Sequence, residues 1–378
     1  MAQISDLIRD SRLDTYFLPD HRVETVHAYR ESDPTGQRRV VNRSEHWKRE
    51  KKIGGGGYGD VWLEKCTSGG QPNCTFRAVK QMTVDLKYGA IDYNRELEAI
   101  AKFSHKRYER CFVRSFGWYE DGDQLFIAME YLEAGDMFSL LYQKPPLPEI
   151  DAKEIADQIL EGLDMMHDNG FAHRDLKPNN ILIKSHPPNG WWIKIADFGI
   201  SKRIEEGNVP FSTVRGTQGY IAPERYGLVE QGSEYATDIW ALGEIVFQLL
   251  TQKPTFKNFA LLAKFMAQPD IFPCGELVKL NVSSLGIDFV LAVMNPSPTE
   301  RLTAKLALSH EWIKKVTETA KTPMKFDFSK TSPMNPTNEN LDNPTEDQFA
   351  AWSTLSIRPK PANKIPGKAL QEETLLDG

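Results

Sequence analysis

The feature that most constrains this chain is an ordered series of three short polar motifs. The first is the octet His173–Asn180, which reads His-Arg-Asp-Leu-Lys-Pro-Asn-Asn. The second, Asp197–Gly199, reads Asp-Phe-Gly and follows the alternating residues of a strand, and the third, Ala222–Glu224, reads Ala-Pro-Glu. One such triplet arises easily by chance, but all three in this order and at these intervals do not. We therefore interpret the series as the mark of one common architecture and not as a set of chance matches.

A glycine-rich stretch precedes these motifs. Residues 53–61 fit the pattern G-x-G-x-x-G-x-V through Gly54, Gly56, Gly59 and Val61. Glycine has no Cβ, so the backbone can come close to a polyphosphate and point its N–H groups at it. A flexible turn is the other interpretation of such a run. The strand-like flanks and the motifs downstream favour a loop that covers phosphates.

Lys80 ends a strand-like run, Phe76–Lys80, that follows the glycine-rich stretch. A lysine on a strand is usually only solvated. Here Glu96 lies in the next segment, where apolar residues recur at helical spacing. An ion pair between Lys80 and Glu96 would hold the ammonium group against the α- and β-phosphates of a nucleotide.

The chain divides into three zones by composition. Residues 1–46 are polar without a clear periodicity, and we assign this N-terminal extension no function. Residues 47–316 alternate periodic apolar segments with turns. Residues 317–378 are rich in Pro, Thr, Ser, Asn, Lys and Glu, which predicts a mostly disordered tail. The predicted fold class is α+β, in which a small β-rich N-lobe, 47–130, precedes a larger, mainly helical C-lobe, 133–316.

Charge and cysteine content exclude several classes of protein. The formal net charge of −6 argues against a DNA coat or a polybasic membrane-surface protein, so we expect no nucleic-acid and no membrane partner. No apolar run is long enough to span a membrane, and the start shows neither a signal peptide nor a myristoylation glycine. These features predict an intracellular protein, cytoplasmic or nuclear or both.

The four cysteines form no disulfide framework and show no zinc-binding spacing. Cys66 and Cys74 flank a turn and would face each other across a hairpin. Two free thiols and a redox-active pair are both compatible with this placement.

Taken together, the motifs resemble those of the eukaryotic protein kinase superfamily over about residues 47–316. The lysine in Asp175–Lys177 resembles the serine/threonine branch of that superfamily. Asp238–Gly243 resembles the central helix of the family, and Arg301 lies where the family pairs an arginine with the glutamate of Ala222–Glu224. The resemblance implies a bilobal fold.

The resemblance also implies a reaction, the ATP- and Mg²⁺-dependent transfer of a γ-phosphate to serine or threonine hydroxyls of protein substrates. The catalytic residues it implies are Asp175, Lys177, Lys80 and Glu96, and the metal ligands it implies are Asn180 and Asp197. In this scheme Asp175 orients the substrate hydroxyl and accepts its proton, and Lys177 steadies the transferred phosphate.

A nucleotide pocket follows from the same resemblance. Its residues by position are Gly54, Gly56, Gly59, Val61, Ala78, Lys80, Met129, Glu130, Leu132 and Leu182. Met129 matches the gatekeeper, and the backbone around Glu130–Leu132 would hydrogen-bond the adenine edge. Plain core packing remains open for Val61, Ala78 and Leu182.

Regulation by phosphorylation is a further expectation. Thr213 resembles the usual activation-loop site, with Ser212 as the alternative acceptor. Arg174 and Lys202 would pair with the phosphate, which carries about −1.5 to −2 charges. The phosphate would come from an upstream kinase or from the protein itself. Thr217 is expected to position Asp175.

Two other functions remain open. A pseudokinase-like scaffold would bind nucleotide or partners without transfer, and Ser115 favours it because the family commonly has a leucine at this place. A small-molecule kinase of similar fold is the second, and the complete segment 216–224, which resembles a peptide-substrate platform, counts against it. The sequence determines neither the substrate nor the oligomeric state.

Overall fold

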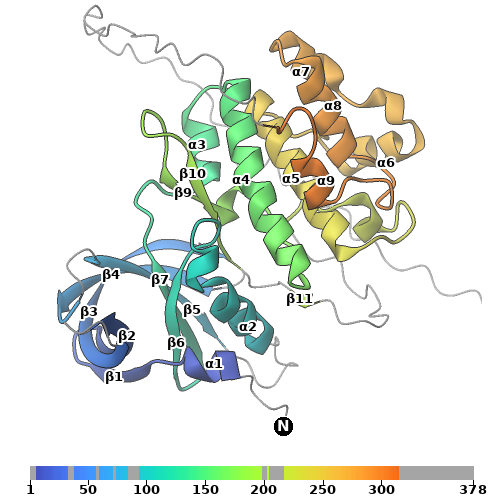
Figure 1. Cartoon of the computed structure of the whole chain (residues 1–378). Coiled ribbons are helices and arrows are strands. Elements are labelled where there is room, and N and C mark those ends of the chain that lie inside the picture. The colour runs from blue at the N-terminus through green and yellow to red at the C-terminus, as the bar shows by residue number, and fades with distance from the viewer. Residues whose placement is uncertain are drawn as a thin grey trace, which may run out of the picture. The chain divides into compact units, whose positions relative to one another are not determined.

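The computed structural model describes residues 6–32, 38–56, 59–70, 74–83, 93–197, 202–203 and 217–314 of the 378-residue chain. All of them belong to one compact unit that ends at Phe326. Strands dominate its first part and helices its second, so the predicted α+β class with a β-rich lobe before a helical lobe is confirmed (Figure 1). The predicted tail, 317–378, lies outside the described residues.

The first lobe contains seven strands and two helices among its described residues. The strands are β1 (Asp14–Leu18), β2 (Arg22–Ser32), β3 (Arg38–Gly56), β4 (Gly59–Ser68), β5 (Phe76–Thr83), β6 (Ser115–Asp121) and β7 (Gln124–Glu130). The helices are α1 (Asp6–Asp10) and α2 (Tyr93–Phe103). The strands form one antiparallel sheet in the order β1-β2-β3-β4-β5-β7-β6.

The segment that leads into β1, one outer strand of this sheet, bonds to β6, the other outer strand, and so closes the sheet into a barrel. The N–H of Leu13, just before β1, donates to the Trp118 carbonyl of β6 at 2.8 Å, and the Trp118 N–H donates to the Ser11 carbonyl at 3.1 Å. Gly117 permits this approach, since it adopts a φ of +133° and a Cβ there would lie 2.6 Å from the Ser11 oxygen. Closure leaves fewer strand edges exposed. Figure 1 shows β1, β2 and β3 curling round beside β4.

The sheet has two apolar faces, because side chains alternate along each strand. Inside the barrel lies a cluster made of Leu13, Val23, Trp47, Val79, Tyr119, Phe126 and Ala128. On the other face, α1 and α2 cover a second cluster, made of Ile8, Leu97, Trp118, Leu125 and Ile127. The nucleotide-pocket residues of β4 and β5 belong to this second side, away from the barrel interior.

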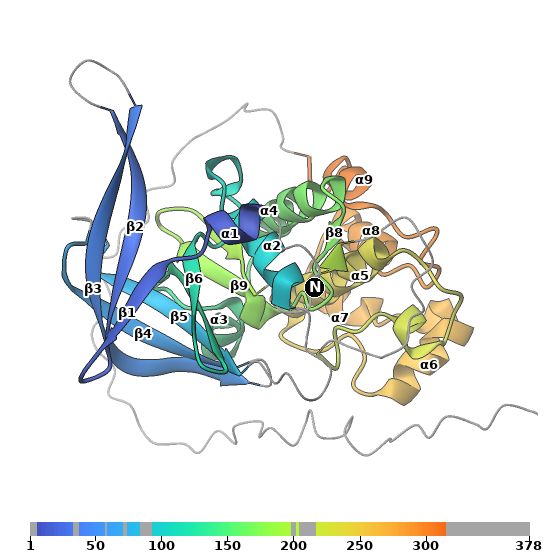
Figure 2. The same ribbon diagram turned by 90° about the horizontal axis from the view of Figure 1, so that it is seen from below.

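Residues 1–46, the predicted extension, contribute α1, β1, β2 and the start of β3 to this lobe. The predicted boundary after residue 46 therefore falls inside β3. Strand β2 pairs with β1 only as far as Val26, and β3 pairs with β4 only from His46 onward. Beyond those residues β2 and β3 run on together as a two-stranded arm (Figure 2).

The second lobe is mainly helical. Its helices are α3 (Met137–Gln143), α4 (Glu149–Asp168), α5 (Glu234–Thr251), α6 (Phe259–Ala267), α7 (Cys274–Lys279), α8 (Ser284–Val293) and α9 (Ala304–Leu308). Two short antiparallel pairs accompany them, β9 (Ile181–Ser185) with β10 (Trp192–Ile195), and β8 (Phe171–Ala172) with β11 (Lys202–Arg203). Short 3₁₀ turns of this lobe lie at Pro178–Asn180, Pro223–Tyr226 and Pro269–Ile271, and one of the first lobe, Lys106–Tyr108, follows α2.

Helices α4 and α5 form the core of this lobe. The apolar stripe of α4 is completely buried, and the helix is followed by Gly170, whose φ of +80° suits a glycine after a helix end. Ser233 caps the start of α5, since its hydroxyl accepts from the Tyr235 N–H, and the helix is buried on nearly all sides. Among the described residues, no helix combines the length and apolarity that a membrane crossing requires.

Cys66 and Cys74 are free thiols in this structure. Both pack against the cluster inside the barrel.

Candidate active site

Three charged residues meet on the face of the sheet that α2 covers. We call this face the cleft side, because the second lobe supplies one of the three residues. Lys80 on β5 directs its ammonium group to Glu96 of α2, with 2.9 Å between Nζ and Oε1. The same nitrogen lies 2.7 Å from Oδ1 of Asp197, which follows β10 in the second lobe. The side chains of Lys80 and Glu96 are 7% and 6% exposed, whereas that of Asp197 is 30% exposed. The predicted pair of Lys80 and Glu96 is present, and Asp197 joins it.

Burial and charge act in opposite directions on this group. Burial favours the neutral amine of Lys80, but the carboxylates of Glu96 and Asp197 outweigh it, and the pKa of Lys80 is raised above its ordinary value. Burial also raises the pKa of Glu96, against the lowering effect of Lys80. Lys80 therefore remains a cation that can hold an anionic ligand.

A second cluster surrounds Asp175 at the start of the helical lobe. Its Oδ1 accepts from the backbone N–H of Thr217 at 3.0 Å and from the Thr217 hydroxyl at 2.9 Å. Its Oδ2 lies 2.8 Å from the ammonium of Lys177, which also reaches the Thr217 hydroxyl at 2.7 Å. Asn180 donates through Nδ2 to the Asp175 carbonyl at 2.8 Å. Asp175 is thus held from three sides, and Thr217 positions it as expected.

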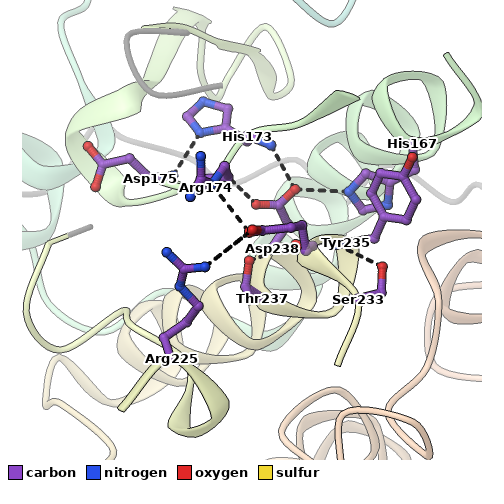
Figure 3. A network of polar contacts seen from close by, with 10 residues as sticks. His167, His173, Arg174, Asp175, Arg225, Ser233, Tyr235, Thr237 and Asp238 are labelled. Carbon is purple, nitrogen blue, oxygen red and sulfur yellow. Dashed lines mark hydrogen bonds and ion pairs between the residues drawn. The ribbon is translucent and has the colours of Figure 1, made fainter. Parts of the chain in front are cut away.

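The loop that carries Asp175 is fastened to α5 through Asp238, a buried carboxylate (Figure 3). Its Oδ2 accepts from the His173 N–H at 2.8 Å and lies 2.9 Å from His167 Nε2, and its Oδ1 accepts from the Arg174 N–H at 2.8 Å. Arg174 has a φ of +69°, an uncommon conformation for a residue with a side chain. Two backbone bonds to one carboxylate explain how the loop keeps this shape.

Sequence reasoning gave Asp238 a place in the central helix but no role at the site. The signal was present, because Asp238 directly precedes the apolar run Ile239–Leu242 in this helix. A buried carboxylate needs hydrogen-bond donors, and the nearest donors are the backbone of the motif itself.

The residues that would hold Mg²⁺ have the right chemistry. Asn180 and Asp197 supply an amide and a carboxylate, the oxygen ligands that Mg²⁺ prefers. The Ala196 N–H donates to the Asn180 carbonyl at 2.8 Å, so the backbone segments that carry the two residues are neighbours. Because Asn180 donates through its Nδ2, its Oδ1 is oriented as an acceptor.

These contacts coincide with a family match. A sequence profile of the protein kinase domain matches residues 47–313 of the chain, which include Lys80, Asp175 and Asp197. The chain belongs to the protein kinase family.

Several curated kinases are similar to this chain. The serine/threonine-protein kinase cds1 of Schizosaccharomyces pombe is 32% identical over 58% of this chain and 47% of its own length. The serine/threonine-protein kinase RAD53 of Saccharomyces cerevisiae is 33% identical over 63% of this chain and 30% of its own length. A calcium/calmodulin-dependent protein kinase of Metarhizium anisopliae is 29% identical over 74% of this chain and 70% of its own length. The match thus spans about half of the first of these relatives.

The expected adenine pocket of this kinase is partly assembled. Met129 and Leu182 pack against a buried group made of Val113, Leu132 and Ala196. Of these, Ala196 is the residue directly before Asp197. Strand pairing places Ala78 opposite Met129. The predicted residues therefore converge from both lobes.

In the segment between the lobes, one backbone N–H already donates a hydrogen bond within the protein. The Glu130 N–H donates to the Arg114 carbonyl at 2.9 Å, so it is not available to an adenine ring. The Glu130 carboxylate binds Lys194 and lies 3.7 Å from Lys184. The adenine contacts predicted around Glu130–Leu132 must come from other groups of that segment.

The glycine-rich loop joins β3 to β4. Gly54 pairs with Val61 across the two strands, and Gly56 pairs with Gly59. Gly59 has a φ of +119°, and a Cβ there would lie 2.2 Å from the Gln81 carbonyl. Only glycine fits this position, where the start of β4 lies close against the backbone of β5. Residues 57 and 58 lie outside the described residues.

The predicted phosphate partner Arg174 has a protein partner in this structure. Its Nε lies 3.2 Å from Oε2 of Glu234, at the start of α5. Arg225 binds the same carboxylate, with Nη1 at 3.2 Å and 3.4 Å from its two oxygens. Thr213, Ser212 and the Lys202 side chain lie outside the described residues, so the rest of this prediction concerns positions that the structure does not describe.

Two further kinase features concern packing. Glu224 and Arg301 form the expected ion pair, with side chains fully buried and Nη1 2.7 Å from Oε1. Ser115, the departure from the family pattern, starts β6 and donates its hydroxyl to the Ala128 carbonyl at 3.1 Å. The serine is therefore satisfied within the sheet.

Proposed function

We propose that this kinase transfers the γ-phosphate of ATP to serine or threonine hydroxyls of protein substrates. The observation that carries this proposal is that Lys80 contacts a carboxylate from each lobe. Its Nζ lies 2.9 Å from Oε1 of Glu96 in the first lobe and 2.7 Å from Oδ1 of Asp197 in the second. Phosphoryl transfer needs positioned charges more than covalent chemistry. The names of the relatives, cds1 and RAD53, support the serine/threonine class.

Each residue has one task in this mechanism. Lys80 anchors the α- and β-phosphates, and Glu96 keeps its ammonium group in place. Asp175 accepts a hydrogen bond from the substrate hydroxyl and takes its proton as the phosphate moves. Lys177, 2.8 Å from Asp175, offers a positive charge beside the transferred group. When bound by Asn180 and Asp197, Mg²⁺ would neutralise charge that develops on the phosphates.

The test compares the purified chain with its Asp175→Asn variant, using ATP, Mg²⁺ and a generic protein acceptor. We expect the variant to transfer phosphate about 10²- to 10⁴-fold more slowly, because the proton acceptor is lost. Asp270→Asn, at an exposed position far along the chain, is the matched control and should match the unaltered protein. Equal, background-level rates in all three would instead favour the pseudokinase-like scaffold.

Regulation of the kinase is a second part of the proposal. Arg174 and Arg225 share Glu234, and a phosphate would compete with this carboxylate for Arg174 because it carries more charge. Phosphorylation of Thr213, or of Ser212, would then draw Arg174 away from α5 and order the segment beside Asp175. Lys202 would supply a second cation.

Mass spectrometry after incubation with ATP tests this regulation. We expect phosphate on Thr213 in the unaltered protein, and a loss of activity of about tenfold in Thr213→Ala. Phosphate that appears in the unaltered protein but not in Asp175→Asn identifies autophosphorylation, whereas its absence from both points to an upstream kinase. Full activity of Thr213→Ala with Ser212 unmodified contradicts the proposal.

A further inference from the structure

The barrel of the first lobe contains a cavity that the proposed phosphate transfer does not use. Its volume is about 230 Å³, and it lies where the turn between β1 and β2 meets β3, β4, β6 and β7. It belongs to the interior of the barrel, whereas Lys80 and Ala78 face the other side of β5. The cavity is therefore separate from the candidate active site.

The floor and one wall of the cavity are aromatic. Tyr119 and Phe126 are only 2% and 5% exposed, and their rings stack with centroids 5.0 Å apart and 10° between their planes. Phe17 of β1 is 47% exposed, and its ring centroid lies 6.0 Å from each of the other two. A buried aromatic floor beside a half-exposed aromatic wall offers favourable contacts to a flat ring.

The volume sets the size of the ligand. An apolar cavity of about 150 Å³ takes up benzene, and pockets for drug-sized ligands begin near 300 Å³. The cavity of about 230 Å³ lies between these limits. It is therefore large enough for one substituted ring.

Two guanidinium groups border the cavity. Arg22 donates through Nε to the Pro19 carbonyl at 3.2 Å, and its side chain is 46% exposed. Arg49 lies over the Trp62 ring at 4.5 Å and donates through Nη1 to Gln81 Oε1 at 3.1 Å. A guanidinium has five N–H donors in a planar fork that matches a carboxylate. Each arginine can therefore offer further donors to a ligand.

Three acidic residues lie at or beside the cavity: Glu64, Asp121 and Asp20. Glu64 is buried against Arg77, whose Nε and Nη2 lie 2.9 Å and 2.8 Å from its Oε2, so the pair is neutral as a unit. Asp121 is exposed at the end of β6, where water screens its charge. Asp20 is exposed as well, and its Oδ2 lies 3.7 Å from Nη2 of Arg22. Two arginines thus face two carboxylates that water screens. An anionic ligand would be held by the directed N–H donors of the arginines and not by an excess of positive charge.

We propose that this cavity binds a small aromatic carboxylate. The ring lies against Phe17 and the Tyr119–Phe126 pair, and the carboxylate accepts hydrogen bonds from Arg22 and Arg49 at the rim. The site needs no ATP and no phosphate transfer, because its lining and the charged residues of the cleft lie on opposite faces of the same sheet.

The experiment uses 4-fluorobenzoate as the probe and follows its ¹⁹F NMR signal with the full chain. We expect saturable broadening that unlabelled benzoate reverses, and at least tenfold weaker binding of neutral 4-fluorobenzyl alcohol, because charge-assisted bonds are lost. Absence of saturable broadening, or equal binding of the alcohol, overturns the proposal.

Two matched variants locate the site. Arg22→Gln should weaken binding of the probe about five- to tenfold, which corresponds to about 1–1.4 kcal/mol. Arg12→Gln is the control, since Arg12 is exposed in the same barrel, pairs with Glu120 and does not line the cavity. Thermal unfolding of both variants verifies the fold. Equal weakening by the two substitutions contradicts the proposed site.

Asp175→Asn separates this proposal from the proposed function. The variant should bind the probe as the unaltered chain does, although it transfers no phosphate. Loss of probe binding in Asp175→Asn contradicts the independence of the cavity. Probe binding by a chain that lacks any kinase activity supports the cavity and overturns only the proposed transfer.

Discussion

Lys80 and Arg77 lie on the same strand, β5, and bury a positive charge on opposite faces of the sheet. Arg77 points into the barrel, where it binds Glu64, donates to the Thr25 hydroxyl at 3.1 Å and lies over the Trp47 ring at 4.3 Å. Lys80 points into the cleft, toward carboxylates of α2 and of the second lobe.

Arg77 and Lys80 differ in the elements that supply their hydrogen-bond and ion-pair partners. Glu64, Thr25 and Trp47 all belong to strands of one closed sheet, so the surroundings of Arg77 are rigid. The two partners of Lys80 belong to elements that pack separately, and one of them, Asp197, is partly exposed. A cation surrounded by one rigid sheet stabilises the fold, whereas one held by separate elements can exchange a carboxylate for a phosphate.

The largest expected effect comes from Lys80→Arg. The planar guanidinium cannot replace a compact ammonium group between Glu96 and Asp197, so we expect kcat/KM to fall at least about 100-fold. The melting temperature should change little, because the charge is kept. Phosphate transfer and thermal unfolding measure the two effects. Lys65→Arg, on the exposed side of β4, is the control, and activity of Lys80→Arg close to that of the control contradicts the assignment.

Arg77→Met should have the opposite effect: it should lower the stability of the protein and leave its kinase activity almost unchanged. The substitution leaves the Glu64 carboxylate buried without its partner, so we expect a loss of about 3–5 kcal/mol in the free energy of unfolding. The activity of the folded fraction should stay within about twofold, because Arg77 does not face the cleft. Urea denaturation measures the loss.

The double variant Arg77→Met with Glu64→Met is the control for this prediction. It removes both charges, and it should recover most of the stability. An Arg77→Met protein that is fully stable, or one that is folded but inactive, would contradict the view that Arg77 serves stability and Lys80 serves activity.

A smaller effect is expected from Ile8→Ala. Ile8 is buried between α1 and α2 beside Leu97, and the carbonyl of Ile8 accepts from the Trp118 indole at 2.9 Å. Its truncation should cost about 2 kcal/mol and raise the KM for ATP several-fold, because α2 carries Glu96. Leu7→Ala, at an exposed neighbour, is the control for unfolding and for kinetics. Equal effects of the two substitutions would show that α1 does not support α2.

The smallest effect concerns pH and the barrel side of the sheet. His27 faces the Glu45 carboxylate, the Thr25 hydroxyl and the cations Arg77 and Arg114, and burial together with these cations lowers its pKa to about 4. The unfolded chain takes up a proton below about pH 6.5, whereas the folded chain does so only near its lowered pKa. Stability from this group is therefore full above pH 6.5 and is lost as the pH falls toward 4.

His27→Gln tests this dependence. Between pH 6.5 and 5.5 the unaltered protein should lose about 1 kcal/mol of stability that the variant keeps. Urea denaturation at both pH values measures the difference. Identical pH profiles would contradict a neutral, buried His27, and kinase activity at fixed pH should be the same in both proteins.

Local sequence motifs predicted much of the candidate site. Lys80, Glu96, Asp175 and Asp197 were identified from their motifs, and the structure brings Lys80, Glu96 and Asp197 together. The fastening of the loop by Asp238 was missed, because it depends on backbone N–H groups that no side-chain pattern reveals.

The closure of the barrel was also missed, for a different reason. The inward positions of β2 are Val23, Thr25 and His27, so two polar residues interrupt the alternation that normally predicts a strand. Their polar groups are satisfied by Arg77 and Glu45, which are distant in sequence. A glycine inside a strand, Gly117, was the available signal, since it marks a close approach of another backbone.

Because β3 is one continuous strand, it limits where a fragment of this protein can begin and still fold. The strand runs from Arg38 to Gly56, and the family match begins at Trp47, in the middle of it. A fragment trimmed to that match would lose β1 and β2 and uncover Trp47, Tyr119 and Phe126, whose side chains would then promote aggregation. Expression of this enzyme therefore requires a start point ahead of α1, well before the first residue that similarity alone would recommend.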